Sequence, residues 1–447
     1  MVILTLNCGS SSVKYQVYDW QQSNVLASGI VERVGLGDSV INHKAPGICD
    51  FVNEHDCPSH TVAIELILRT IMDPKYGVVK DMKEIAAVGH RMVHGGMKFA
   101  RSVLINDESL ATFKELIDLA PLHNPANIMG VEAARQVLPG VPHTATMDTA
   151  WHQTMPETSY LYSLPREWYE KFMVRRYGFH GTSFLYTAKR AAVLLGKDPF
   201  DTNLIIAHIG NGSSINAIKN GCSYDTSMGM TPLEGLVMGT RAGDMDPGII
   251  FHMIKKAGLT PAEVENKLNK ASGVLGITSH WTDRRDIENA AEGGNKIAQL
   301  AQEIEGYRIK KYIGAYFAAL GRVDALVFTA GVGEMGPITR QLASAGLEEL
   351  GIVLDHERNN KAKCRNAELE ISAPGSKVKI YVIPTDEELV MTEDAYALMN
   401  GSYDVHTNYH YRFQDPGYVN KQRAEGLEKD LKKKPYLADL IAHPPKK

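Results

Sequence analysis

The sequence has few cysteines and no paired arrangement of them. Its 447 residues include an odd number of cysteines, five, and no two of them form a C-x-x-C pair. A disulfide framework and a zinc site built on C-x-x-C spacing are therefore not expected, and a reducing, cytoplasmic location fits this usage. The cysteines are Cys8, Cys49, Cys57, Cys222 and Cys364.

Long apolar runs and a strong excess of charge are also missing. No apolar stretch approaches the ~18 residues needed to span a bilayer, and Met1 leads into a strand-like segment without the basic and apolar regions of a secretory leader. The net charge is −4, which argues against a general nucleic-acid binder. With 44% apolar residues, the chain is expected to be globular, with neither membrane nor nucleic acid as a partner.

The two commonest nucleotide-binding motifs are absent or out of context. The pair Gly196-Lys197 is followed by Asp198 and lacks the upstream glycine of a Walker A loop. The motif Gly331-x-Gly333-x-x-Gly336 matches a dinucleotide fingerprint, but it lies late in the chain and Pro337 follows it directly. A nucleotide enzyme of this sequence would use another scaffold.

A hairpin with a glycine-serine turn opens the chain. Residues 3–6 are apolar or β-branched, Asn7 to Ser12 contain glycine and three serines, and Val13, Tyr15 and Val17 alternate after the turn. Such a turn directs several N–H groups and hydroxyls toward one spot, which suits a phosphate, and Lys14 adds a positive charge. An ordinary hairpin turn is the alternative for this stretch alone.

The same pattern recurs in the middle of the chain. An apolar strand from Leu204 runs into His208-Ile209-Gly210-Asn211-Gly212, then two serines, then a second alternating strand. Two such hairpins in the same order predict a duplicated α/β architecture with nucleotide between the copies. Helices are expected near residues 61–72, 182–195 and 298–320, and strands at 85–91, 324–329 and 378–383.

Two further stretches stand out. Residues 224–248 are dense in Gly, Thr, Asp and Met, and an irregular segment of that length is typically functional. Beyond about Gly401 the chain becomes polar, which predicts an appended surface tail or short helix.

With these residues in view, the chain resembles the acetate kinases, the acetokinase family of the acetate and sugar kinase/Hsc70/actin superfamily. The resemblance spans nearly all of residues 1–400. It is carried by eight ordered blocks, namely Asn7–Lys14, His90–Gly96, Ala120–Pro125, Asp148–Gln153, Arg176–Thr182, His208–Ser214, Asp225–Pro247 and Pro384–Leu389.

The resemblance implies two actin-like, ribonuclease H-like domains with a nucleotide cleft between them and hinge closure on nucleotide. The expected domains are 1–150, completed by about 386–400, and 151–385, followed by the tail 401–447. The implied reaction is reversible transfer of a phosphoryl group from ATP to acetate, giving acetyl phosphate and ADP, with Mg²⁺ or Mn²⁺ as the metal. The resemblance also implies a homodimer. Phosphoryl transfer needs mainly in-line positioning and neutralised charge.

The family's functional positions fall on residues of this chain that match its motifs. The implied catalytic residues are Asp148, His180 and Arg241. The implied substrate contacts are Arg91, Val93, Leu122, His123, Phe179 and Pro232. The implied nucleotide contacts are Ser10, Ser12, Lys14, His208, Ile209, Gly210, Asn211, Gly212, Asp283, Arg284, Arg285, Gly331, Val332, Gly333, Glu334 and Met335. Asn7 and Glu387 match the metal positions, and sequence alone barely separates Glu387 from the adjacent Glu388.

Chemistry qualifies one of these roles. Acetate is already ionised near pH 7, since a carboxyl pKa is roughly 4 to 5. No proton has to be removed, so Asp148 is expected to orient the metal, its water or Arg241 rather than transfer a proton. A residue smaller than Val93 would open room for propionate, but one methylene in such a pocket discriminates by only ~1–3 kcal/mol, so propionate is expected as a slower substrate and butyrate is expected to crowd Val93.

Two departures from the family pattern lie on the adenosine side. Arg284 stands where an aromatic residue is usual, and Met335 where Asn is usual. A propionate kinase and a pyrophosphate-linked acetate kinase are therefore the sibling alternatives. A nucleotide-binding sensor without turnover is the alternative from another class, and the intact catalytic set argues against it.

Overall fold

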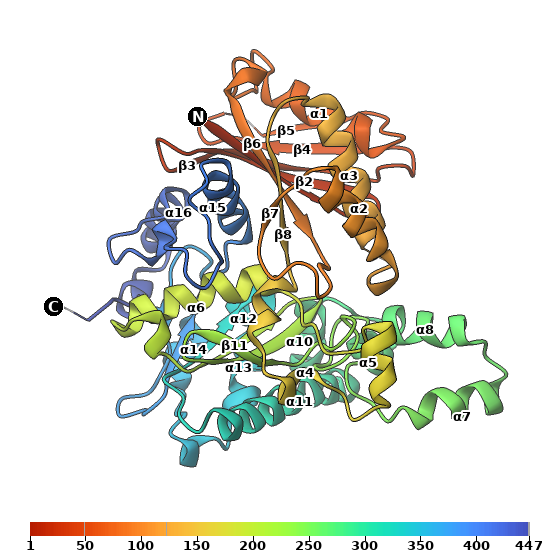
Figure 1. The fold of residues 1–447 in the computed structure, drawn as a ribbon. Coiled ribbons are helices and arrows are strands. Elements are labelled where there is room, and N and C mark those ends of the chain that lie inside the picture. Colours follow the sequence, from red (N-terminus) through yellow and green to blue (C-terminus); the bar gives the residue numbers. More distant parts are fainter. Residues whose placement is uncertain (49, 122, 446–447) are drawn as a thin grey trace. The chain divides into compact units, whose positions relative to one another are not determined.

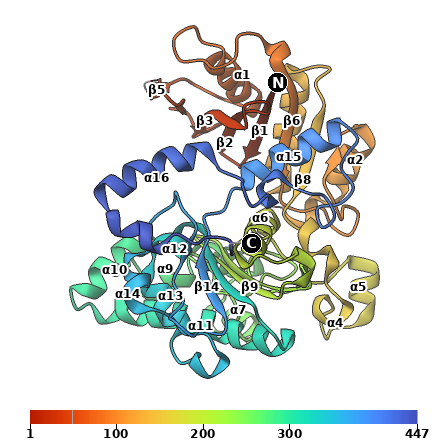
Figure 2. The same ribbon diagram turned by 90° about the vertical axis from the view of Figure 1, so that its left-hand side faces the viewer.

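The computed structural model describes residues 1–48, 50–121 and 123–445, and the chain forms two compact units (Figures 1 and 2). Each contains one β-sheet with helices packed on it. The expected α/β class with two similar halves is confirmed. The first unit contains 1–153, 386–411 and 419–422, and the second contains 154–385, 412–418 and the residues from 423 on.

The sheet of the first unit has the strand order β5-β4-β3-β2-β1-β6-β8-β7. Its central strands β1, β6 and β8 are parallel, and the flanking pairs are antiparallel. The strands are β1 (Val2–Cys8), β2 (Ser12–Asp19), β3 (Asn24–Glu32), β4 (Val40–Lys44), β5 (Phe51–Glu54), β6 (Ile85–Met92), β7 (Val103–Leu104) and β8 (His143–Met147).

Helices cover both faces of this sheet. Helices α1 (His60–Ile71) and α3 (Asn124–Val137) pack on the face that carries Leu4 and Leu6. Helix α15 (Glu387–Met399) packs on the opposite face, where a Cβ on Gly89 would lie 3.1 Å from the carbonyl oxygen of Met391. This close approach of the helix requires glycine, and α15 begins with Glu387.

The sheet of the second unit has the order β11-β10-β9-β12-β14-β13. Strands β9, β12 and β14 are parallel, and both edges are antiparallel. The strands are β9 (Leu204–Ile209), β10 (Ser213–Lys219), β11 (Cys222–Thr226), β12 (Ala325–Thr329), β13 (Leu369–Glu370) and β14 (Lys379–Val382).

This second sheet is also covered on both faces. Ile205, Ala207 and Ile209 of β9 join a core with Ile309 and Ile313 of α11 (Lys296–Leu320). The alternate face of β9 meets α6 (Gly181–Leu195), since the His208 ring contacts Ser183. The remaining helices of this unit are α4 (Glu157–Tyr160), α5 (Arg166–Phe172), α7 (Gly248–Ala257), α8 (Pro261–Lys270), α9 (Gly273–Thr278), α10 (Arg284–Glu292), α12 (Ala330–Met335), α13 (Pro337–Ser344), α14 (His356–Lys361) and α16 (Lys421–Lys433), and α2 (Asp107–Glu115) belongs to the first unit.

The two sheets share one topology. The order β3-β2-β1-β6-β8 in the first unit corresponds to β11-β10-β9-β12-β14 in the second, with a hairpin at the same place in each. Both predicted glycine-serine hairpins are therefore confirmed. The predicted irregular segment 224–248 is confirmed for 227–247, whereas 224–226 belong to β11 and Gly248 begins α7.

The segment after residue 400 differs from the expected solvated tail. It forms the predicted helix, α16, but Leu437 and Leu440 are buried in the core of the second unit and Ile441 forms a β-bridge with Leu369. Phe413 is fully buried as well. The expectation of a surface tail was wrong for these residues, because a few apolar side chains of this polar segment pack into the core of the second unit.

Four cysteines fall within the described residues, and all four are free thiols. Burial raises the pKa of Cys8 to about 12, and burial is also the first cause that raises the pKa of Cys57, Cys222 and Cys364. None of the helices formed by the described residues combines the length and the apolar character that a bilayer span requires.

Candidate active site

The first hairpin turn is held by hydrogen bonds within the first unit. The N–H of Gly9 donates to the carbonyl of Ser12 at 2.8 Å, and the His60 ring contacts the carbonyl oxygen of Gly9 at 2.8 Å. Asn7 lies opposite Lys14 in the β1–β2 register. The turn residues Ser10 and Ser12 therefore lie on a fixed loop, with a predicted metal position and a predicted phosphate contact side by side.

Arg91 and Asp148 form a bidentate ion pair at the ends of neighbouring parallel strands. Nε of Arg91 donates to Oδ1 of Asp148 at 2.9 Å, and Nη2 donates to Oδ2 at 2.6 Å. The Asp148 side chain is 1% exposed and the Arg91 side chain 23%. Both oxygens of the carboxylate are therefore occupied by one guanidinium, which suits a positioning role for Asp148.

The carboxylates at the start of α15 lie near the same arginine. Burial opposes the charge on Arg91, but Asp148, Glu387 and Glu388 together raise its pKa. Burial and the charge of Asp386 raise the pKa of Glu388, while Lys14 and Arg91 lower it. The predicted residues Lys14, Arg91 and Glu387 thus belong to one charged cluster of the first unit.

This cluster fits a hard divalent cation. Asn7, Glu387 and Glu388 supply oxygen donors, and Mg²⁺ prefers one or two protein oxygens with phosphate and water completing its shell. Among the described residues no group of three or more His, Cys, Asp and Glu side chains is arranged to hold a metal without other ligands. Burial raises the pKa of Glu388, and a cation bound nearby would favour the ionised form of this carboxylate.

Hydrogen bonds join the two segments that contain the predicted substrate residues Val93 and His123. The N–H of Val93 donates to Oδ1 of Asn127 at 3.0 Å, and the N–H of His94 donates to Oδ1 of Asn124 at 3.2 Å. Val93 is buried, and His123 immediately precedes α3. Leu122, the third predicted residue here, lies outside the described residues.

The second hairpin turn carries a histidine pair in the other unit. Nδ1 of His180 contacts Oγ of Ser214 at 2.8 Å, and the His180 ring stacks on that of His208 with centroids 4.0 Å apart. His208 in turn contacts Oγ of Ser183 at 2.9 Å. His208 therefore packs against His180, and its role as a nucleotide contact stays a prediction.

Arg241 and His180 converge on Gly212. A Cβ built on Gly212 would lie 3.3 Å from Nη1 of Arg241 and 3.5 Å from Nε2 of His180. Arg241 is half-buried, burial lowers its pKa, and its Nη1 donates to the carbonyl of Pro232 at 3.5 Å. No carboxylate of the described residues lies within ion-pair distance of it. A partly desolvated cation without a counter-ion beside a glycine-rich turn is arranged to receive an anion.

Two arginines, Arg176 and Arg308, fix the loop that carries Arg241 by hydrogen bonds and an ion pair. Nη1 of Arg176 donates to the carbonyls of residues 226, 227 and 228, and its Nη2 donates to Glu234 at 2.6 Å. Arg308 donates to the carbonyls of Gly235 and Asp244. These contacts fix the irregular segment without secondary structure. Phe179, which precedes His180 in the sequence, is fully buried.

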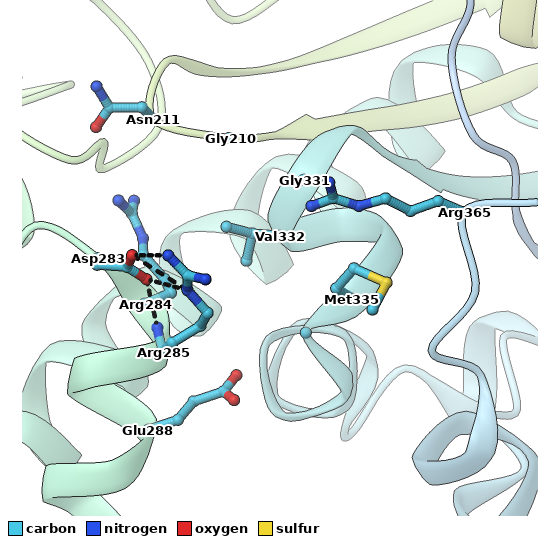
Figure 3. Close-up of a pocket in the computed structure, with 11 residues that line it drawn as sticks. Gly210, Asn211, Asp283, Arg284, Arg285, Glu288, Gly331, Val332, Met335 and Arg365 are labelled. Carbon is cyan, nitrogen blue, oxygen red and sulfur yellow. Dashed lines mark hydrogen bonds and ion pairs between the residues drawn. The ribbon is translucent and has the colours of Figure 1, made fainter. Parts of the chain in front are cut away.

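A cavity of about 400 Å³ opens in the second unit beside the second turn. Figure 3 shows its residues, which come from the turn, the start of α10, and α12. Predicted contacts that line it are Gly210, Asn211, Asp283, Arg284, Arg285, Gly331, Val332 and Met335, and further lining residues are Glu288, Gly336 and Arg365.

The two arginines of α10 are each neutralised. Arg285 donates to Asp283, which lowers the pKa of that carboxyl to about 2. Arg284 is buried, and its Nη2 donates to Oε1 of Glu305 at 2.7 Å. The cation that replaces the family's usual aromatic residue is therefore bound to a buried carboxylate.

Some predicted nucleotide contacts do not line this cavity. The carbonyl of Gly333 accepts from Arg340 at 2.8 Å, and Oε1 of Glu334 accepts from the N–H of Thr385 at 3.4 Å. Ile209 is buried in its strand. Arg365 and Glu288 were missed by the sequence interpretation, because the resemblance assigns no role to either of them.

Comparison with known proteins agrees with this arrangement. The model of the acetokinase family matches residues 2–393, which is most of the chain. The chain belongs to the acetokinase family.

Members of this family are similar to the chain over nearly its full length. An acetate kinase of Treponema pallidum is 59% identical over 442 residues, covering 99% of both chains. An acetate kinase of Geobacter sulfurreducens is 58% identical and covers 94% of this chain and 100% of its own.

Solved structures of the family show the same fold. That of Porphyromonas gingivalis acetate kinase has a TM-score of 0.85 at 49% identity, covering 89% of this chain and 99% of its own. That of a propionate kinase from Francisella tularensis has a TM-score of 0.82 at 40% identity, covering 89% of this chain and 99% of its own. Family membership makes this chain a phosphotransferase of the acetate kinase type.

Proposed function

We propose that this acetokinase-family enzyme transfers the γ-phosphoryl group of ATP reversibly to a carboxylate oxygen of acetate, giving acetyl phosphate and ADP. A new O–P bond forms from the acetate oxygen, and the bond between the γ-phosphorus and the bridging oxygen of ADP breaks. Acetate enters ionised, so no proton is transferred. The observation that carries the proposal is the convergence of Arg241 and His180 on Gly212, with no carboxylate opposite the guanidinium.

Each proposed residue has a role that its surroundings support. Arg241 and Nε2 of His180 neutralise charge on the transferring phosphoryl group, for which positioned cations and donors are the main catalytic device. Arg91, oriented by Asp148, holds the acetate carboxylate. Val93 and His123 of the first unit, and Phe179 and Pro232 of the second, are assigned to acetate by the family resemblance, as is Leu122.

Nucleotide is assigned to the cavity of the second unit and to the two turns. Asp283, Arg285 and Gly331–Met335 are assigned to the adenosine. The loop 208–212 is assigned to phosphate, as are Ser10, Ser12 and Lys14. The cavity of about 400 Å³ suits a nucleoside, and Arg284 is neutralised by Glu305, so the pocket does not present an extra cation for pyrophosphate. These features favour ATP over pyrophosphate as the donor.

Asn7 and Glu387 are the proposed protein ligands of Mg²⁺, with Mn²⁺ as a substitute. When bound with nucleotide, the cation would neutralise phosphate charge. We also propose that the enzyme is a cytoplasmic homodimer, as its low cysteine usage and its family suggest.

Trapping acyl phosphate with hydroxylamine tests the proposal. Acetate, propionate and butyrate are each offered with ATP and Mg²⁺ or with pyrophosphate. We expect acetate with ATP to give the highest rate, propionate a lower one, and butyrate little product because Val93 is buried and its backbone is anchored. Higher rates with pyrophosphate would show that pyrophosphate, and not ATP, is the donor. No product from any pair would indicate a nucleotide-binding protein without turnover.

A further inference from the structure

The segment after residue 400 forms hydrogen bonds with the chain immediately before Glu387. Nη1 of Arg423 donates to the carbonyl of Pro384 at 2.8 Å, and its Nη2 donates to the carbonyl of Thr385 at 2.5 Å. Nδ2 of Asn420 donates to Oδ2 of Asp386 at 2.9 Å. Two side chains separated by less than one helical turn thus hold three consecutive residues of the chain.

The residues they hold lead directly into the proposed metal ligand. Asp386 uses its other oxygen, Oδ1, to accept from the N–H of Leu389 at 3.1 Å, which caps α15. Its carboxylate is therefore shared between Asn420 and the first turn of the helix that begins with Glu387. Rotation of the Asp386 side chain would break this capping hydrogen bond.

Arg423 also lies near Glu334, which is one of the predicted nucleotide contacts. Oε1 of Glu334, in α12, accepts from the N–H of Thr385 at 3.4 Å, and Arg365 lies 3.7 Å from its Oε2. Glu334 is buried, and the charges of Arg423 and Arg365 counter the effect of burial on its carboxylate. Residues of the same short helix, Val332 and Met335, line the cavity.

The helix that carries Arg423 is firmly attached. Leu427 and Leu431 of α16 pack against the core of the second unit, and Nδ2 of Asn366 donates to Oδ2 of Asp430 at 2.8 Å. An arginine fork on a fixed helix can hold two carbonyls in one orientation, which a flexible surface tail could not do.

We propose that Arg423 and Asn420 are positioning residues, which fix Pro384–Asp386 so that Glu387 is held ready for the cation bound with nucleotide. The assignment rests on the proposed function through the role given to Glu387. The C-terminal segment is then a part of the enzyme's metal-binding apparatus, and Arg423 acts through the main chain without touching the reacting atoms.

Binding of Mn²⁺ in the presence of ADP, followed by electron paramagnetic resonance of the free ion, tests this without turnover. Residues that orient metal ligands typically contribute 10–100-fold to metal affinity. We therefore expect Arg423→Gln and Asn420→Ala to raise the Mn²⁺ dissociation constant at least about tenfold. Glu387→Gln should weaken binding further, and the KM for acetate should stay within about twofold.

Lys421→Ala is the matched control, because Lys421 lies between the two residues but donates to the carbonyl of Gln22. Its Mn²⁺ affinity should match that of the unaltered enzyme. Arg423→Lys keeps the charge without the fork and should behave like Arg423→Gln. Unchanged Mn²⁺ affinity in folded Asn420→Ala and Arg423→Lys would overturn the proposal, as would unchanged affinity in Glu387→Gln.

The two proposals fail in different ways. An unaltered enzyme that makes no acyl phosphate contradicts the proposed function, while the comparison of Mn²⁺ affinities still decides the positioning role. Normal acyl phosphate formation, weaker Mn²⁺ binding in Glu387→Gln and unchanged binding in the Arg423 and Asn420 variants would together contradict the positioning role alone.

Discussion

Arg91 and Arg241 are both partly buried arginines in glycine-rich surroundings, yet their partners differ. Arg91 is bound by both oxygens of Asp148. Arg241 has a carbonyl oxygen 3.5 Å away and forms no ion pair with any carboxylate in the described part of the chain. A carboxylate partner fixes the first guanidinium in place, whereas the second keeps its charge for an incoming anion.

This difference predicts the behaviour of an Arg241→Lys variant. Lysine keeps the charge but loses the planar fork, so we expect kcat to fall about 10²–10³-fold while the fold is unchanged. Steady-state kinetics of acetyl phosphate formation measure the effect. Exposed Arg322→Lys is the control and should retain full activity. An unchanged kcat in correctly folded Arg241→Lys would remove Arg241 from the catalytic set.

Residue roles were predictable from sequence where they lie inside matched blocks. The cluster of Lys14, Arg91 and Glu387 comes together as expected. Arg365 and Glu288 could not be found, because only folding brings them to the cavity. The partner of Asp148 was also not predictable: sequence suggested the metal, its water or Arg241, and the structure gives it Arg91.

At the scale of elements, the irregular loop 227–247 lies directly against the second turn. A Cβ on Gly239 would lie 1.8 Å from Oδ1 of Asn211, and the N–H of Gly239 donates to the carbonyl of Asn211 at 2.9 Å. The loop and the turn are therefore in direct backbone contact, and Asn211 lines the cavity.

A Gly239→Ala variant should displace the Asn211 side chain, which lines the cavity. We expect the KM for ATP to rise at least about tenfold, with the KM for acetate within about twofold, because small displacements of positioning groups are costly. Gly314→Ala is the control, since the same Cβ meets nothing within 4 Å in the middle of α11 and should stabilise that helix by about 1 kcal/mol. Equal KM values for ATP in both variants would contradict the argument.

The C-terminal segment gives a second prediction at this scale. Leu437→Ala and Leu440→Ala should each lower the free energy of unfolding by about 2–5 kcal/mol, because both side chains are buried in a core. Denaturant unfolding measures this. Val419→Ala is the control, since that side chain is 61% exposed and should change stability little. A solvated tail would make all three variants alike.

The elements themselves were largely predictable. Alternation of apolar residues located both hairpins, and the 3.6-residue period located α1, α6 and α11. The tail was misjudged because its lysines and prolines dominate its composition, while burial depends on a few leucines. Composition reports an average, and packing depends on position.

At the scale of the whole molecule, two buried histidines link stability to pH. Nε2 of His90 and Nδ1 of His143 are 2.9 Å apart between neighbouring strands. Burial lowers the pKa of His143 from 6.5 to about 4, and burial together with His143 lowers that of His90 well below 6.5. Both rings are therefore neutral in the folded chain.

The sign of the pH dependence follows from proton binding. Below pH 6.5 the unfolded chain binds protons at these two positions that the folded chain does not, so stability is complete above pH 6.5 and falls as the pH drops toward 4. His143 alone should account for about 3 kcal/mol of that loss. Denaturant unfolding at stepped pH measures it.

A His90→Gln/His143→Gln double variant should show a flatter pH dependence of unfolding than the unaltered chain. Exposed His280→Gln is the matched control and should leave the slope in place. If the double variant retains the full slope, other groups carry the acid sensitivity.

The buried thiols have a practical consequence. Because burial suppresses the thiolate form of Cys8, Cys57, Cys222 and Cys364, maleimide dyes should react slowly with them. Once Cys49, which lies outside the described residues, is replaced, cysteines introduced on the surface can carry a pair of fluorophores. Energy transfer between dyes on the two units, measured with and without nucleotide, would then test the hinge closure that the family resemblance implies.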